Sequence, residues 1–127
     1  MLTEPVPHLS LQEIVDLGYA GIKAQGAFAT KADGGCVYLN AKGHACIIGH
    51  CLTPDEARAM DLGSEVDTSI EGLPDEVIPD RLLAHDREVL AMLQGCHDSV
   101  SSDANWALFE ERITNFCERH NLRRPTC

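Results

Sequence analysis

The sequence predicts an α+β domain in which three to four helices pack around one short antiparallel β-hairpin. Three observations support this fold class. Helix-capping residues precede apolar residues at helical spacing, and two short β-prone runs flank a turn. The length of 127 residues suits one hydrophobic core. We therefore expect a single domain over residues 1–127, with an extended lead-in over residues 1–8.

The first helix is expected over residues 11–25. Ser10 is followed three positions later by Glu13, which is the pattern of a capping box. Apolar residues such as Ile14 and Ile22 then recur at helical spacing, and Gly26 is a typical stop.

The hairpin is expected over residues 36–48. Residues 36–39 and 44–48 are rich in β-prone side chains, and Gly43 stands in the intervening turn, where a positive φ is needed. A register that sets Cys36 opposite Cys46 would allow a disulfide, whereas a reducing compartment favours free thiols. An isolated hairpin is marginal in water, so it has to pack on the helices.

The second helix is short and starts after Thr53, with Pro54 at its first position. Residues 63–80 contain one glycine and two prolines after Gly63 and no helical stripe, so they are read as a long acidic surface loop.

Two further helices complete the prediction. The third is expected over residues 81–94, ended by Gly95. The last helix opens at Trp106 and has a continuous apolar stripe. Ser102 or Asp103 is expected to cap it, and Asn121 to take a left-handed conformation at its end. Trp106 is read as a core anchor.

Charge excludes one class of function. The chain has a formal net charge of −10, which argues against direct binding of nucleic acid, because phosphate affinity depends on clustered Lys and Arg. No apolar run is long enough to span a membrane, and the N-terminal residues lack the pattern of a secretory signal. We therefore expect a cytoplasmic protein with no membrane partner.

The negative charge is concentrated in residues 55–111, which hold fifteen acidic and three basic residues. Such a surface attracts a basic partner. The expected partner-binding residues are Glu65, Asp67, Glu71, Asp75, Glu76 and Asp80. Two alternatives remain open: a merely solvating surface, or neutralisation within the fold by the basic residues Arg112, Arg119, Arg123 and Arg124.

Cysteine and histidine gather near the predicted hairpin. A zinc site there would use Cys36, Cys46, His50 and Cys51. The spacing is not that of a zinc knuckle or ribbon, so buried free thiols and no cofactor are the competing interpretation. Farther along, Cys96, His97 and Asp98 are adjacent, but adjacent residues rarely converge as a catalytic triad. No catalytic residue is assigned.

One stretch resembles a family of small uncharacterised phage and prophage proteins. The resemblance rests on Cys36 and Tyr38 in a C-x-Y segment, on Cys46-Ile47-Ile48-Gly49, and on the helix start Pro54-Asp55-Glu56. It covers about residues 10–122 and implies a phage accessory gene acting in the host bacterial cytoplasm, with no assigned activity.

Three functions follow as hypotheses. The leading one is a phage-encoded acidic protein that inhibits a basic host protein, in the manner of an anti-CRISPR or other host-defence inhibitor that mimics DNA. The second is a small zinc- or thiol-dependent enzyme centred on the Cys/His cluster. The third is a structural or assembly protein that oligomerises through the last helix; the chain itself is expected to be a monomer or homodimer.

Overall fold

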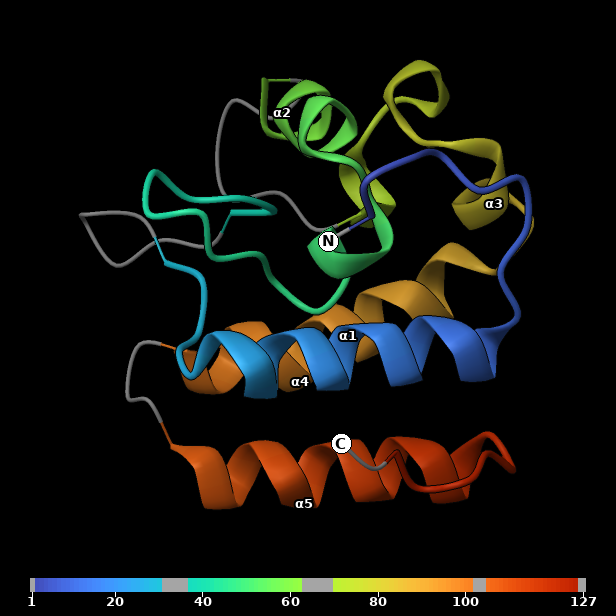
Figure 1. Cartoon of the computed structure of the whole chain (residues 1–127). Coiled ribbons are helices and arrows are strands. Elements are labelled where there is room, and N and C mark those ends of the chain that lie inside the picture. Colours follow the sequence, from blue (N-terminus) through green and yellow to red (C-terminus); the bar gives the residue numbers. More distant parts are fainter. Residues whose placement is uncertain (1, 31–36, 63–69, 102–104, 126–127) are drawn as a thin grey trace.

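The structure is a computed structural model that describes residues 2–30, 37–62, 70–101 and 105–125. Its elements in chain order are α1 (Leu11–Gln25), η1 (Gly49–Cys51), α2 (Pro54–Leu62), η2 (Ile70–Gly72), η3 (Asp75–Val77), α3 (Asp80–Leu83), α4 (Arg87–Ser101) and α5 (Trp106–Arg119), where η denotes a 3-10 turn. They form three layers: α5 lies on one side, α1 and α4 lie in the middle, and α2, α3 and the η turns lie on the other side (Figure 1).

The predicted α+β class is wrong, because the described residues are helical and contain no strand, sheet or hairpin. The turn over residues 40–43 is present: Asn40 N–H donates to the His44 carbonyl at 2.9 Å, and Gly43 has φ +83°. Pairing then stops after a single bridge between Leu39 and Ala45.

The pairing does not continue after Ala45, because the residues that follow are buried on both faces. Ile47 and Ile48 are consecutive and fully buried, whereas a half-exposed strand would turn alternate residues to solvent. From Gly49 the chain coils into η1, which packs on α1. Core packing therefore overrides the β propensity of these residues.

Two glycines of α1 allow this close packing. A Cβ on Gly18 would lie 2.3 Å from Cγ1 of Ile47 and 2.6 Å from its carbonyl oxygen. A Cβ on Gly21 would lie 2.3 Å from the ring of His50. Glycine lowers the stability of a helix. At these two positions the close packing of residues 47–50, which a larger residue would prevent, offsets that loss.

The start and end of α1 confirm the prediction. Glu13 N–H donates to Ser10 Oγ at 3.1 Å, and Ser10 N–H donates to Glu13 Oε1 at 2.8 Å. Gly26 closes the helix in a left-handed conformation with φ +69°. The second predicted helix is confirmed as α2, with the same reciprocal pair between Thr53 and Glu56 at 3.3 and 2.8 Å.

The predicted third helix over residues 81–94 is wrong in its bounds. The chain forms the short α3, breaks, and restarts as α4, where Asp86 Oδ1 accepts from the N–H of Glu88 at 2.8 Å. Gly95 does not end the helix, because the apolar stripe continues beyond it through the buried Val100. A helix with a buried face tolerates one internal glycine.

The last helix agrees with its prediction except at its cap. Phe109, Ile113 and Phe116 are buried as expected. Asn105 Oδ1 accepts from Leu108 N–H at 3.0 Å and caps α5, whereas Ser102 and Asp103 lie outside the described residues. The left-handed Asn121, with φ +56°, is confirmed.

Trp106 is half-buried and stacks on Phe28, with ring centroids 4.3 Å apart. The contact joins the start of α5 to the segment that follows α1.

The predicted acidic loop has a described part and an undescribed part. Residues 63–69 lie outside the described residues. Residues 70–80 include η2 and η3 and are anchored to the core by Ile70, Leu73 and Ile78, all buried. Among the helices in the described ranges, none has the length and apolar character needed to cross a membrane.

Candidate functional site

The predicted zinc ligands point in different directions. Cys46 Sγ accepts from the N–H of Gly49 at 3.3 Å, and Cys51 Sγ donates to the carbonyl of Ile14 at 3.6 Å. Cys36 lies outside the described residues. In the part of the chain that can be described, no three Cys, His, Asp or Glu side chains form a group that could hold a metal ion.

His50 belongs to the same predicted set and is buried against α1. Its Nε2 lies 3.0 Å from Oε1 of Gln25, which also accepts from the N–H of Ala45 at 3.0 Å. Because a carbonyl oxygen only accepts, His50 Nε2 carries the proton. Burial lowers the pKa of His50 to about 4, so the imidazole is neutral at physiological pH.

The cysteines in the described ranges are poor nucleophiles. Burial raises the pKa of Cys46, and the nearby Asp98 carboxylate raises it further. Burial also raises the pKa of Cys51 to about 12 and that of Cys96 to about 11. The reactive species is the thiolate, so these positions do not provide an activated thiol at neutral pH.

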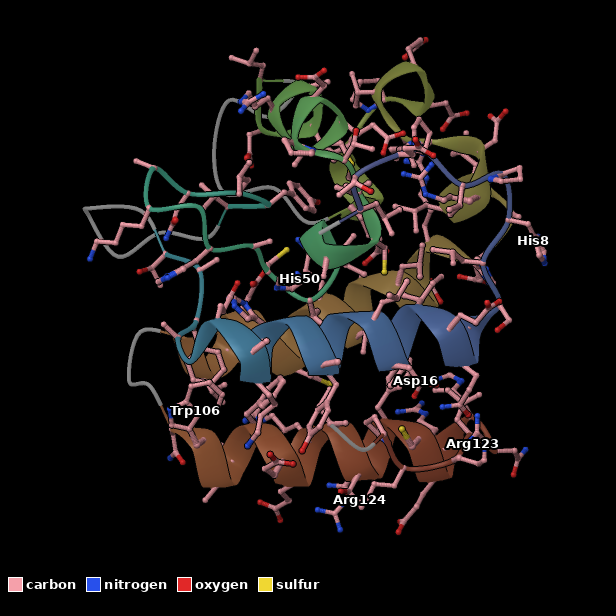
Figure 2. All side chains as sticks on the ribbon, in the orientation of Figure 1. His8, Asp16, His50, Trp106, Arg123 and Arg124 are labelled. Atoms are coloured by element: carbon pink, nitrogen blue, oxygen red, sulfur yellow. The ribbon has the colours of Figure 1, made fainter. Side chains whose placement is uncertain are left out.

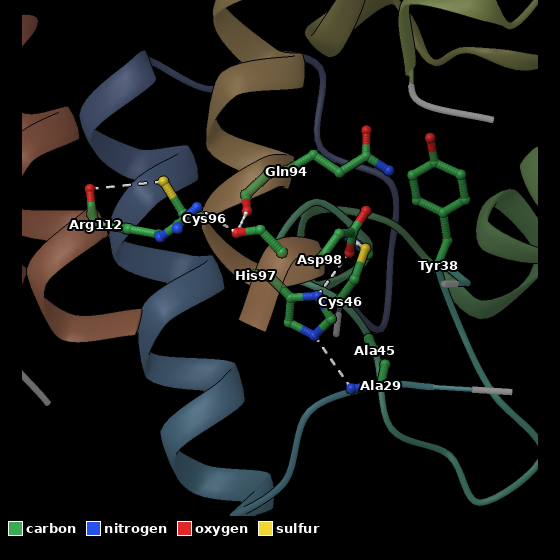
Figure 3. Close-up of polar contacts among 12 residues, drawn as sticks. Ala29, Tyr38, Ala45, Cys46, Gln94, Cys96, His97, Asp98 and Arg112 are labelled. Atoms are coloured by element: carbon green, nitrogen blue, oxygen red, sulfur yellow. Dashed lines mark hydrogen bonds and ion pairs between the residues drawn. The ribbon is translucent and has the colours of Figure 1, made fainter. Parts of the chain in front are cut away.

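His97 occupies a fully buried position between α4 and the segment after α1 (Figure 3). The N–H of Ala29 donates to Nε2 at 3.1 Å, and Nδ1 lies 2.7 Å from Oδ1 of Asp98. Because the amide can only donate, Nε2 accepts and Nδ1–H donates to the carboxylate. Both ring nitrogens are therefore engaged, and neither is available to take a proton from a substrate. The pair fastens residue 29 to α4.

The acidic surface is the predicted site that remains. Of the predicted residues, Glu71, Asp75, Glu76 and Asp80 are exposed, and Glu65 and Asp67 lie outside the described residues. They belong to η2, η3 and α3, in the layer that also contains α2 (Figure 1). We call the exposed carboxylates of this layer the acidic face: Asp55, Glu71, Asp75, Glu76, Asp80 and Asp86.

Two arginines of this layer serve the fold. Arg81 is 4% exposed; its Nε donates to the Cys51 carbonyl at 3.0 Å, Nη1 donates to the Val6 carbonyl at 3.2 Å, and Nη2 pairs with Glu56. Desolvation opposes ionisation of Glu56, but the hydrogen bonds from Arg81 and Thr53 outweigh it and lower its pKa.

Arg87 has a similar role at the start of α4. It donates to the Leu73 carbonyl at 2.6 Å and pairs with Asp75, which joins η3 to α4. Within the described ranges no ion pair involves Glu71, Glu76 or Asp80. Asp55 pairs with Arg58 at 2.9 Å. Among the described residues, four of the six carboxylates of the acidic face therefore lie outside any ion pair.

The basic C-terminal residues lie on the other side of the molecule. Arg123 Nη2 is 3.9 Å from Asp16 of α1, and Arg124 Nη2 is 3.9 Å from Glu110 of α5 (Figure 2). Arg112 donates to Ser99 Oγ at 2.7 Å. The described contacts of these arginines are thus with α1, α4 and α5, and none is with the acidic face.

Two members of the acidic face were missed in the sequence analysis. Asp55 follows Pro54 in the first turn of α2, and Asp86 precedes α4. Both are acidic residues at helix N-termini, where the helix dipole favours a carboxylate. That position in the sequence could have identified them as exposed acidic residues. The burial of Arg81 had no counterpart in the sequence.

Comparisons of the chain with protein-family models, with curated proteins and with solved structures found no match.

Proposed function

We propose that this chain is an acidic interaction protein that binds a basic, nucleic-acid-binding protein and competes with nucleic acid for its surface. The observation that carries the proposal is charge segregation. The acidic face occupies one outer layer, whose one exposed arginine among the described residues, Arg58, pairs with Asp55. Arg123 and Arg124 pair instead with carboxylates of α1 and α5. The resemblance to phage accessory proteins makes a bacterial host the place to look for the partner.

The chemistry of the face supports this function. Carboxylates that protrude from short, anchored turns keep their relative positions, so they act as a preorganised negative surface. Buried Ile70, Leu73 and Ile78 supply the anchoring, and Arg81 and Arg87 hold the turns to the neighbouring elements. A basic groove that binds phosphates would gain long-range attraction to such a surface.

The test uses a charge-neutralised variant and a matched control. The double variant E76Q/D80N removes two exposed carboxylates from the acidic face. The control E111Q/E118Q removes two exposed carboxylates from α5, on the opposite side of the fold. Each protein is immobilised and exposed to a nuclease-treated bacterial lysate at low salt. Bound proteins are eluted with salt or with a duplex DNA oligonucleotide.

The expected result is retention of nucleic-acid-binding proteins by the wild type and the control, loss of retention by the face variant, and elution by both salt and DNA. The dependence on salt follows because exposed charges are screened. If the face variant retains the same proteins as the wild type, or if added DNA releases none of them, the proposed function is wrong.

A further inference from the structure

The outer face of α4 and α5 has features of an interface. On α4, Glu88, Met92, Gly95 and Ser99 are separated by four, three and four residues, which places them on one stripe. Beside this stripe runs a groove of about 430 Å³ between the two helices. Its lining includes Met92, Cys96, Phe116 and the two arginines Arg112 and Arg119.

The centre of this face is apolar and open. Met92 is 37% exposed and is one of two large apolar side chains exposed among the described residues. Gly95 lies one turn farther along, and a Cβ built on it would meet nothing within 4 Å. Gly18 and Gly21 make room for other parts of the chain, but Gly95 makes room for nothing in its own fold. A bare helix surface of this kind permits close approach by another helix.

The two ends of the face carry opposite charges. Glu71 and Glu88 line a shallow hollow with Met92 at one end. Arg112 reaches Ser99 at the other end, at 2.7 Å. At a rise of about 1.5 Å per residue, Glu88 and Ser99 are about 16 Å apart along α4, and the midpoint falls between Met92 and Gly95.

We propose that a second copy of this chain docks on this face about a twofold axis that passes between Met92 and Gly95. A twofold interface is formed by the same patch on both copies, so residues at one end meet residues at the other. Glu71 and Glu88 of one copy then lie opposite Arg112 of its partner, and Met92 packs against Gly95. Both charge contacts occur twice.

The first experiment places a long charged side chain at the centre of the face. Sedimentation velocity over a wide range of protein concentration should show a dimer for the wild type. G95K should be monomeric, because Lys forms helix well and has open space in the monomer but obstructs the partner. A24K, at an exposed position of α1, is the matched control and should dimerise. A wild type that remains monomeric, or a G95K variant that dimerises as well as A24K, overturns the proposal.

The second experiment tests the pairing of the ends. E88R and R112E should each raise the dimer dissociation constant by about ten-fold, since each creates two like-charge contacts. The double variant E88R/R112E should restore it, because the charges are exchanged but remain complementary. If both single variants dimerise more weakly and the double variant does not restore dimerisation, the twofold arrangement is wrong. None of these substitutions alters the carboxylates used to test the acidic face, so the two proposals succeed or fail separately.

Discussion

The imidazole ring of His50 lies directly against the backbone of Gly21, so closely that a Cβ at that glycine would be 2.3 Å from Cγ and Nδ1 of the ring. One turn earlier, Gly18 has the same relation to Ile47. These contacts seat residues 47–50 on α1 without an intervening layer of side chains. Residues 47–50 thus belong to the buried core.

Replacing glycine by alanine should have opposite effects on stability at Gly18, which is closely packed, and at Gly95, which is not. We expect G18A to lower the free energy of unfolding by about 1–3 kcal/mol, because the new Cβ overlaps the Ile47 backbone. G95A should raise it by about 0.5–1 kcal/mol, because alanine favours the helix and meets nothing. Urea denaturation at low protein concentration measures both. Equal effects at the two sites would contradict the close packing of α1.

Acid should destabilise the fold through His50. Burial lowers its pKa to about 4 from the ordinary 6.5. Between these values the unfolded chain binds the proton and the folded chain does not, so the free energy of unfolding falls as the pH falls. Between pH 6.5 and pH 4 this effect lowers the free energy of unfolding by about 3 kcal/mol in total. Below pH 4.5, Glu56 adds a further loss as its lowered pKa is approached.

Urea denaturation at a series of pH values between 7 and 4.5 tests this dependence. H50Q should flatten the decline over this range, and H8Q, at an exposed position, should retain it. An undiminished decline in H50Q would show that another group is responsible.

The buried and exposed arginines of the acidic layer should differ in their contribution to stability. R81M removes the buried partner of Glu56 and leaves two backbone carbonyls without a donor, so we expect a loss of about 3 kcal/mol. R58M breaks the exposed pair with Asp55, at 2.9 Å, and should cost less than about 0.5 kcal/mol. Thermal and urea denaturation of both variants provide the comparison, and similar losses would rule out a structural role peculiar to Arg81.

Thiol labelling checks the burial of the cysteines. Cys46, Cys51 and Cys96 should resist a brief exposure to iodoacetamide at neutral pH and react fully in denaturant, because they are buried and their pKa values are raised. Peptide mapping by mass spectrometry locates the label. Rapid native labelling of any of the three would reopen the thiol-enzyme hypothesis.

The fold prediction was accurate where the structure depends on interactions between residues close in sequence, and inaccurate where it depends on long-range packing. The reciprocal bonds of Ser10 with Glu13 and of Thr53 with Glu56 join residues three apart, so the starts of α1 and α2 were predictable. The turn at Gly43 and the left-handed Asn121 were predictable for the same reason. The absence of the hairpin was not predictable, because it depends on the long-range packing of residues 47–50 against α1.

The sequence by itself determined where these two helices start and how strongly acidic the chain is, because local hydrogen bonds and composition need no distant partner. Only the tertiary structure decided that Arg81 is buried, that Gly95 is bare, and that Arg123 and Arg124 pair with Asp16 and Glu110 and not with the acidic face. Each of these outcomes depends on which elements pack together, and packing is a property of the whole chain.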